Sequence, residues 1–168
     1  LTADTYGNAG GIGFSHIPAG LHNTVQGCRL WLNSDDGLDT YGSDCKFTID
    51  NCWAWYNGYL SEKFDVGGNG TGFKLGITRA DYGNTILRTV TNCLAYKNRT
   101  SGFHQNGAVA AIELYNNTAY LNGSEGYWFG SYDKSHRLKN NISYQNGSYC
   151  CLTNSSEVIA NTFLINNK

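Results

Sequence analysis

The chain has 168 residues and a nearly balanced charge, with 12 basic and 13 acidic side chains. This balance gives no sign of a nucleic-acid partner, and no apolar run approaches the ~20 residues that a membrane-spanning helix needs. Glycine (21 residues) and tyrosine (12 residues) are abundant, which favours short strands with many turns. Methionine is absent, so we expect a processed or excised chain. We expect one domain over residues 1–168, with room for a sizeable core.

One short pattern recurs along the chain, an Asn or Cys followed five residues later by Asn. It is found at six pairs of positions: Cys28/Asn33, Cys52/Asn57, Cys93/Asn98, Asn117/Asn122, Asn141/Asn146 and Asn161/Asn166. The first members of successive pairs are separated by 24, 41, 24, 24 and 20 residues. A period of this size is typical of a solenoid, in which residues at the same position of successive repeats become spatial neighbours.

Each repeat combines alternating apolar and aromatic residues with a turn at Asn-Gly, Asp-Gly or Ser-Gly. In chain order the repeats read TVQGCRLWLNSDDGLDTY, TIDNCWAWYNG, RTVTNCLAYKNRTSGFHQN, IELYNNTAYLNGSEGYWFG and HRLKNNISYQNGSYCC. This pattern predicts an all-β parallel β-helix of about six to seven coils, and it lacks the periods of leucine-rich or helical repeats. The longer step between Cys52 and Cys93 predicts loops that project around 59–71 and 76–82, where binding sites often form.

The recurring Asn residues predict a ladder of side-chain amides between adjacent coils. Cys28, Cys52 and Cys93 should stack at about the strand spacing of 4.8 Å, either bridged by disulfides or as small buried side chains. The sequence does not choose among the possible pairings of its six cysteines. Seven N-x-S/T sequons fit a secreted glycoprotein, although an Asn-rich chain forms sequons by chance. We expect the sequons at Asn98 and Asn122, like that at Asn146, to be buried.

A second repeating position carries the candidate chemistry. Glycine follows the recurring Asn by four residues in three repeats, and Gly72 holds the same place once the first loop is removed. The second residue after each of these glycines is then in register, and these residues are Asp39, Lys74, His104 and Trp128. We expect their side chains to form one column on the outer face of the coils.

Three carboxylates lie beside this column in Ser34-Asp35-Asp36-Gly37-Leu38-Asp39. Such crowding suits a hard cation such as calcium, to which the Leu38 carbonyl could add a ligand, although a solvated acidic turn explains the motif as well. Lys74 lies in an apolar segment, where burial would lower its pKa and make it a general base. An ion pair with Asp39 would instead raise that pKa. His104 is less suited to act as the only base.

The chain resembles a known family in several segments that follow the same order across residues 8–148: GCRLWLNSDDGLD, TIDNCWAWYNGY, GNGTGFKLG, GFHQN and LYNNTAYLNG. These segments are similar to those of the family nine pectate lyases, which are right-handed parallel β-helices. The resemblance implies that Asp35, Asp36 and Asp39 bind calcium and that Lys74 is the base. The implied reaction is β-elimination on polygalacturonate, in which calcium neutralises the uronate, lysine removes the C5 proton and the glycosidic oxygen leaves C4.

Two segments depart from the family pattern. A stretch like NADGF reads NAGGI here, so one expected calcium carboxylate is missing near Gly10. The family's GFDQN reads GFHQN, which places His104 where a carboxylate would adjoin Lys74 and can shift substrate preference. We expect His104, Asn106 and Trp128 to contact substrate, together with an arginine of the second loop, Arg79.

The sequence therefore predicts a secreted, monomeric lyase that acts on pectate with calcium, without a nucleic-acid or membrane partner. One alternative is a lyase for another uronic-acid glycan such as alginate, glucuronan or a glycosaminoglycan. Another is a non-catalytic carbohydrate-binding β-helix, with Tyr127 and Trp128 exposed for stacking on sugars. A glycoside hydrolase is disfavoured, because glutamate is sparse and off the repeating position, at Glu62, Glu113, Glu125 and Glu157.

Overall fold

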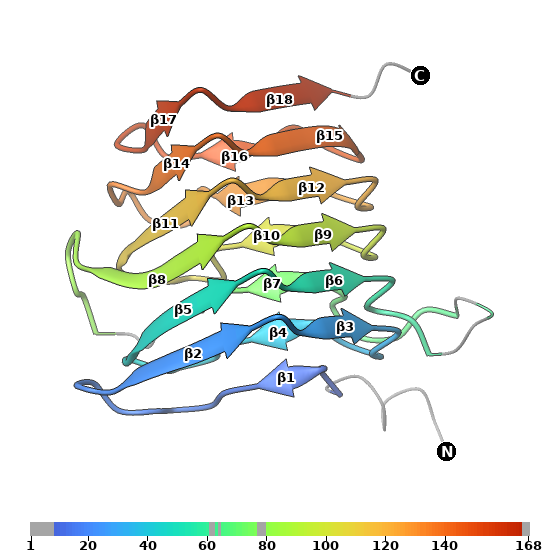
Figure 1. Ribbon diagram of the computed structural model, residues 1–168, viewed down its shortest axis with the longest axis horizontal. Coiled ribbons are helices and arrows are strands. Elements are labelled where there is room, and N and C mark those ends of the chain that lie inside the picture. The colour runs from blue at the N-terminus through green and yellow to red at the C-terminus, as the bar shows by residue number, and fades with distance from the viewer. Residues whose placement is uncertain (1–8, 61–62, 64, 77–79, 166–168) are drawn as a thin grey trace.

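The computed structural model describes residues 9–60, 63, 65–76 and 80–165 (Figure 1). Every regular element in these ranges is a β-strand, and the strands form three parallel sheets of six strands each. No helix in this part of the chain is long and apolar enough to cross a membrane. Each coil contributes one strand to each sheet, so the predicted parallel β-helix is confirmed, with about six coils.

The strands are short, and strands of the same sheet are hydrogen-bonded in coil order. The first sheet contains β1 (Ile12–Gly13), β4 (Leu38–Asp39), β7 (Phe73–Lys74), β10 (Phe103–His104), β13 (Tyr127–Phe129) and β16 (Cys151–Leu152). The second contains β2 (His22–Gln26), β5 (Lys46–Asp50), β8 (Ile86–Thr91), β11 (Ala111–Tyr115), β14 (Arg137–Lys139) and β17 (Glu157–Ile159). The third contains β3 (Arg29–Trp31), β6 (Trp53–Trp55), β9 (Leu94–Tyr96), β12 (Thr118–Tyr120), β15 (Ile142–Asn146) and β18 (Thr162–Ile165).

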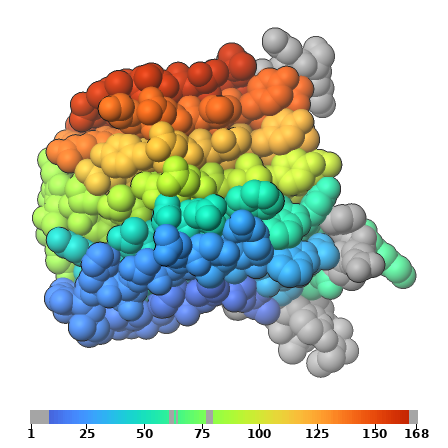
Figure 2. Space-filling model, viewed as in Figure 1, coloured from blue at the N-terminus to red at the C-terminus, as the bar shows by residue number. Residues whose placement is uncertain are grey.

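The coils stack in register despite the uneven repeat length. Figure 2 shows them as successive layers from blue to red. Trp53 of β6 pairs with Leu94 of β9, although 41 residues separate them, just as residues 24 apart pair elsewhere. The additional residues leave the stack after β6, where Tyr59 and Val66 form an antiparallel bridge. Insertions are therefore accommodated as loops, and the register of the sheets is kept.

A ladder of asparagine side chains holds adjacent coils together, as the repeat predicted. Asn57 Nδ2 donates to Asn98 Oδ1 at 2.8 Å, and the same bond joins Asn98 to Asn122 and Asn122 to Asn146 at 2.9 Å. Each of these amides also donates to a backbone carbonyl of the preceding coil, as Asn122 does to Ala95. These side chains are at most 3% exposed, so the ladder satisfies polar groups that water cannot reach.

A second ladder contains both asparagine and cysteine. Asn117 Nδ2 donates to Asn141 Oδ1, and further down the stack the Cys93 amide donates to Asn117 Oδ1. The Cys52 amide then donates to Cys93 Sγ at 3.4 Å, so a thiol takes the place of the amide oxygen. The predicted cysteine column is therefore present, but all six cysteines are free thiols and Cys28 is only half-buried.

The ladders also decide which sequons are accessible. Asn98, Asn122, Asn141 and Asn146 are buried, which confirms the burial expected for three of them. The remaining sequons begin at exposed side chains, Asn69, Asn116 and Asn154. Glycosylation of the chain stays a prediction.

The core behind the first sheet is a stack of aromatic rings. Phe73, Phe103 and Tyr127 lie one above another with ring centroids 4.9 and 5.0 Å apart. Tyr127 is fully buried, and its hydroxyl donates to the Asn117 carbonyl. The expectation that Tyr127 is an exposed sugar-stacking ring is therefore wrong, because successive residues of a strand point to opposite faces.

A buried arginine fixes the turns that follow β4 and β7. Arg88 is fully buried, and its guanidinium donates to the carbonyls of Ser43 and Cys45 and, at 2.9 Å, to that of Gly76. It also donates to Thr40 Oγ1 at 3.0 Å. Burial lowers the pKa of Arg88 to about 10, so the side chain stays charged at neutral pH. Arg88 thereby links the turn after Asp39 to the turn after Lys74 by hydrogen bonds.

The Asn ladder predicts a large loss of stability when one member is removed. Asn122→Ala would remove the acceptor of the Asn98 backbone amide, one of the two acceptors of Asn98 Nδ2 and a donor to the Ala95 carbonyl, all in the core. We expect the free energy of unfolding to fall by roughly 2–4 kcal/mol, measured by urea denaturation. The exposed Asn154→Ala should change it by less than about 0.5 kcal/mol. Equal effects of the two substitutions would contradict the role of the ladder.

His136 predicts a loss of stability in mild acid. Its side chain is fully buried, Nδ1 accepts from the Ile112 amide, and Nε2 has no hydrogen-bond partner among the described residues. Burial lowers the pKa of His136 to about 4, below its usual 6.5. The unfolded chain therefore binds the proton first as pH falls, and stability that is complete above pH 6.5 is lost progressively towards pH 4, by up to about 3 kcal/mol.

The measurement is the difference in urea stability between wild type and His136→Gln across this pH range. The difference should change with pH between about 4 and 6.5. An NMR titration that places the pKa of His136 near 6.5 in the folded protein would contradict the prediction, even if His136→Gln fails to fold.

Candidate active site

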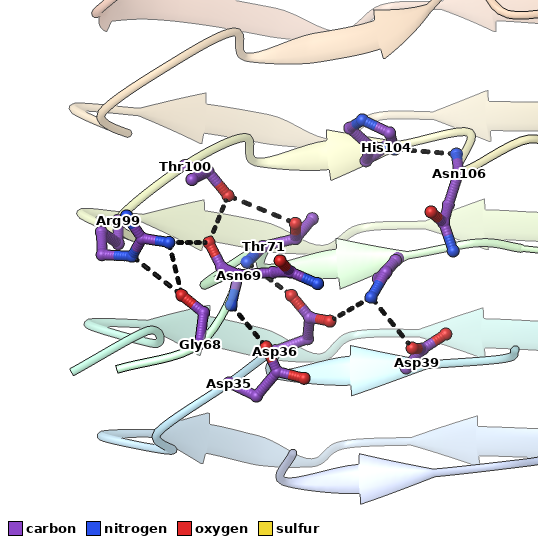
Figure 3. A network of polar contacts seen from close by, with 11 residues as sticks. Asp35, Asp36, Asp39, Gly68, Asn69, Thr71, Arg99, Thr100, His104 and Asn106 are labelled. Carbon is purple, nitrogen blue, oxygen red and sulfur yellow. Dashed lines mark hydrogen bonds and ion pairs between the residues drawn. The ribbon is translucent and has the colours of Figure 1, made fainter. Parts of the chain in front are cut away.

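The first sheet aligns the predicted column of polar residues on its outer face. Asp39 pairs with Lys74, Lys74 with His104, and His104 with Trp128. Their neighbours in the strands, such as Leu38 and Phe73, are fully buried. The alignment predicted from the glycine spacing is therefore confirmed, because each of these residues is paired with the next in adjacent strands. Figure 3 shows Asp39 and His104 on strands of this sheet.

A second column runs beside the first, three residues earlier in each coil. It consists of Gly10, Asp36, Thr71, Ser101 and Glu125. From Asp36 onwards, the carbonyl of each member accepts a hydrogen bond from the backbone amide of a glycine in the preceding coil, as Asp36 O does from Gly11 and Glu125 O from Gly102. The sequence reasoning missed this column and treated Glu125 as off the repeating position. Glu125 precedes Trp128 as Asp36 precedes Asp39, and that spacing was the available signal.

Lys74 forms ion pairs with carboxylates from both columns. Its Nζ lies 2.8 Å from Asp36 Oδ2 and 3.3 Å from Asp39 Oδ2. Burial alone would lower the pKa of Lys74, but Asp36 and Asp39 outweigh burial and raise it. Of the two alternatives that the sequence left open for Lys74, the ion pair with Asp39 that raises the pKa is present, and Asp36 adds a second, closer ion pair. Lys74 is thus a charged ammonium as the structure stands.

The three predicted metal ligands line a single cavity. Asp35, Asp36 and Asp39 share this cavity, of about 560 Å³, with Lys74 and Tyr41. Burial raises the pKa of Asp35 and of Asp39, and the charge of Asp36 adds to the effect at both. Asp39 Oδ1 is buried without a hydrogen-bond partner among the described residues. This donor set suits a hard cation in its chemistry.

The remaining carboxylate oxygens are partly occupied by the loop after β6. The Asn69 amide donates to Asp35 Oδ1, and the Thr71 amide donates to Asp36 Oδ1 at 2.7 Å. Within the described ranges, no three His, Cys, Asp or Glu side chains converge closely enough to enclose a metal ion. Asp36 and Asp39 instead share the ammonium of Lys74. Leu38 is buried, and its amide donates to the Gly72 carbonyl. Its carbonyl as a ligand stays a prediction.

Gly10 occupies the place where the sequence indicated a missing carboxylate. It lines the acidic cavity one coil before Asp36 and in the same column. A Cβ atom at Gly10 would lie 3.2 Å from the Asp36 carbonyl oxygen, so a side chain needs only a small adjustment there. The column therefore has room for a further carboxylate beside the other three.

His104 presents a neutral imidazole on the other side of Lys74. The Asn106 amide donates to His104 Nδ1 at 2.7 Å, and because an amide can only donate, the ring proton of the neutral form is on Nε2. Burial lowers the pKa of His104 to about 4 and Lys74 adds to this, against the opposing charge of Glu125. The ring stacks on Trp128 with centroids 4.3 Å apart. His104 is therefore an uncharged hydrogen-bond donor.

A second cavity, of about 350 Å³, adjoins Lys74 on this side. His104, Asn106, Glu125 and Trp128 line it, so it brings together three of the four predicted substrate contacts. The fourth, Arg79, lies outside the described residues. Lys74 lines both cavities and separates the acidic one from the second.

Arg99 fastens the loop after β6 onto the site. Its Nε donates to the Gly68 carbonyl at 3.0 Å, and its Nη2 donates to the carbonyls of Gly68 and Asn69. Thr100 Oγ1 also donates to the Asn69 carbonyl, at 2.9 Å (Figure 3). The loop in turn supplies the amides that bind Asp35 and Asp36. The sequence does not indicate that Arg99 holds this loop, because the partners of its guanidinium are backbone carbonyls.

The chain is similar in sequence to curated proteins that are named pectate lyases. Pectate lyase L of Dickeya chrysanthemi is 43% identical over 103 residues, which cover 60% of this chain and 23% of that protein. Pectate lyase PEL9 of Emericella nidulans is 34% identical over 125 residues, which cover 61% of this chain and 29% of that protein. The chain thus spans less than a third of the length of these relatives.

Solved structures match over nearly the whole chain. A rhamnogalacturonan lyase matches with a TM-score of 0.76 and 33% identity, covering 92% of this chain and 43% of that one. The crystal structure of pectate lyase Pel9A matches with a TM-score of 0.74 and 34% identity, covering 94% of this chain and 38% of that one. The family model described as the Pel9A-like, right-handed β-helix region matches residues 2–141. The chain therefore belongs to the Pel9A-like right-handed β-helix family.

Proposed function

We propose that this chain carries the active site of a secreted polysaccharide lyase that cleaves pectate by β-elimination, with Lys74 as the base. The observation that carries the proposal is the position of Lys74 Nζ, which lies between the buried carboxylate of Asp36 and the half-buried one of Asp39, on the wall of two open cavities. The relatives named pectate lyase support the substrate class. Because those relatives are much longer than this chain, the activity is a proposal for the whole protein to which these coils belong.

The chemistry assigns separate roles to the residues on either side of Lys74. Asp35, Asp36 and Asp39, with the Leu38 carbonyl, would hold calcium, which when bound supplies a positive charge that neutralises the uronate and acidifies its C5 proton. Lys74 would accept that proton at Nζ, and it must first lose its own. Its two ion pairs keep the amine charged, so the neutral base form requires that another cation take the place of the ammonium beside Asp36 and Asp39.

The residues beyond Lys74 would bind and orient the sugar chain. His104 offers Nε2–H as a donor, and Asn106 and Trp128 line the same cavity. The Glu residues remain unsuited to glycoside hydrolysis, since Glu125 stands without a second carboxylate in its own cavity among the described residues. A solved relative is named rhamnogalacturonan lyase, so the relatives' names leave open which uronic-acid polymer is cleaved.

Removal of the base should abolish turnover. We expect Lys74→Ala to lower kcat on polygalacturonate by at least ~10²-fold, the usual scale for a general base. The measurement is the ultraviolet absorbance of the unsaturated product, with calcium and with chelator. Lys139→Ala, which removes an exposed lysine of the second sheet, should retain the wild-type rate. Full activity of Lys74→Ala would exclude its role, and new reducing ends without absorbance would indicate hydrolysis instead.

The acidic cavity predicts opposite effects of two substitutions on calcium binding. We expect Asp36→Ala to weaken binding and Gly10→Asp to strengthen it, each by roughly tenfold or more, because calcium affinity follows the number of carboxylate ligands. Isothermal calorimetry measures this without turnover. Asp133→Ala, at an exposed position, is the matched control. Unchanged titrations for both cavity variants would contradict the ligand assignment.

A further inference from the structure

Away from the candidate active site, the outer face of the third sheet carries a column of aromatic rings. The rings occupy the same position in five successive strands and are paired in register: Trp31, Trp55, Tyr96, Tyr120 and Tyr144. Figure 1 shows these strands, β3, β6, β9, β12 and β15, one above another. This aromatic column therefore follows the stacking direction of the coils, on a different sheet from Lys74.

The rings of the aromatic column stack on one another. The rings of Trp31 and Trp55 lie with centroids 5.1 Å apart at an interplanar angle of 7°. The three tyrosine rings follow with centroids 5.4 and 5.6 Å apart. Stacking covers the ring faces between neighbours and leaves the edges, which carry O–H and N–H groups, towards solvent. Trp31 is 51% exposed, so the column offers hydrogen-bonding groups on an apolar support that a ligand can reach.

A groove of about 570 Å³ adjoins the aromatic column in the coils of β3, β6 and β9. It is lined by Arg29, Trp53, Trp55, Tyr56, Leu94 and Tyr96. The ring of Trp53 is exposed to solvent in this groove. Mostly apolar, aromatic walls with a few polar groups are typical of sites for small molecules and sugar units, because apolar C–H groups pack on the rings while hydroxyls bind the polar groups.

Two cations lie against these rings. The guanidinium carbon of Arg29 lies 4.3 Å from the centroid of the Trp53 ring, and Lys97 Nζ lies 5.2 Å from that of Tyr96. Arg29 donates to two backbone carbonyls, which are uncharged. Among the described residues, neither cation forms an ion pair with a carboxylate. The aromatic rings therefore position two positive charges that a carboxylate of a ligand can bind.

The six described strands of the third sheet contain no acidic residue. They read RLW, WAW, LAY, TAY, ISYQN and TFLI, although the whole chain has 13 acidic side chains. The acidic residue closest in sequence to Trp53, Asp50, ends β5 of the second sheet and accepts hydrogen bonds from Thr91 and Asn92. The outer face of the third sheet is therefore both aromatic and positive, which complements a ligand with carboxylates and sugar rings.

The shape of this face favours a polysaccharide over a protein partner. The aromatic column is one ring wide and repeats once per coil, at the strand spacing of about 4.8 Å, which is close to the length of one sugar unit in a linear chain. A stable protein interface usually covers a broader patch, of about 800 Å² on each partner, and is depleted in lysine. A narrow row with cations at its side suits a linear acidic polymer.

We propose that the aromatic column and its groove form a second binding site for an acidic polysaccharide chain, in which Arg29 and Lys97 bind uronate carboxylates and the rings support the sugar units. The site holds polymer on a different side of the coils from Lys74. The inference rests on the proposed function for the class of ligand, but it does not require that the bound chain be cleaved.

The first test measures binding of polygalacturonate without turnover and without calcium. Lys74→Ala removes the proposed base, and a chelator removes the cation proposed for the acidic cavity. In this background we expect Arg29→Gln and Lys97→Gln each to weaken binding about three- to tenfold by calorimetry, because each removes one charge that faces a carboxylate. Added salt should weaken binding to the unmodified face as well. Lys139→Gln, at an exposed lysine of the second sheet, is the matched control and should retain the affinity.

The rings are tested in the same background. We expect Trp53→Ala to weaken binding about three- to tenfold, whereas Tyr149→Ala, which removes an exposed ring outside the third sheet, should not. Urea denaturation checks that Trp53→Ala folds, and the two charge variants test the site if it does not. Unchanged affinity of both charge variants overturns the inference.

The second test compares three polymers on the same variants: polygalacturonate, an uncharged galactan and polyglutamate. Tighter binding of polygalacturonate than of either other polymer, lost in Arg29→Gln, supports the site. Equal binding of galactan overturns the role of the cations, and equal binding of polyglutamate overturns the role of the rings. Self-association that Trp53→Ala abolishes in sedimentation would make the face an interface between copies instead. Wild-type protein that binds polygalacturonate through this face but yields no ultraviolet-absorbing product would refute the lyase proposal alone.

Discussion

The structure depends on the in-register stacking of its coils, which the buried asparagine ladders enforce. Each amide donates once to the next amide of its ladder and once to a backbone carbonyl, so a shift of one residue would leave several buried groups unpaired. This constraint explains why the long segment between Cys52 and Cys93 is displaced as loops rather than absorbed into the sheets: Asn57 still reaches Asn98. A site assembled from five coils requires such a rigid register, because an error of one residue would turn Lys74 into the core.

The register converts two positions of the repeat into a grid of functional groups. One column contains Asp39, Lys74, His104 and Trp128, and the other contains Asp36 and Glu125. Charge changes along this grid from two carboxylates, with that of Asp35 beside them, through one ammonium to a neutral imidazole and a single carboxylate. Loop residues complete it, since Arg99 holds the segment whose amides bind Asp35 and Asp36. The surface is therefore organised by coil number, and a substrate along the stack would meet different chemistry at each coil.

Sequence reasoning succeeded where the repeat determines position. The recurring Asn predicted the ladder and the glycine spacing predicted the column through Lys74, because both follow from counting residues within a coil. It missed Glu125, since only one position of each repeat was followed across the coils. It also misplaced Tyr127, although strand alternation places that ring inward if Trp128 is outward. The pKa of Lys74 could not be predicted, because its direction is the balance of burial against two ion pairs whose distances only the folded chain sets.

Because His104 stands where the resembled motif has a carboxylate, the ion pairs of Lys74 are confined to one of its two adjacent coils. With an aspartate there, as in the motif that the chain otherwise resembles, Lys74 would have carboxylates in both adjacent coils. A neutral imidazole leaves all of its ion pairs on the side of the acidic cavity. Both ion pairs of the amine therefore lie within that cavity, while Glu125 lies two coils beyond Lys74. The uncharged ring of His104 thus separates the carboxylates of the acidic cavity from that of Glu125 in the second cavity.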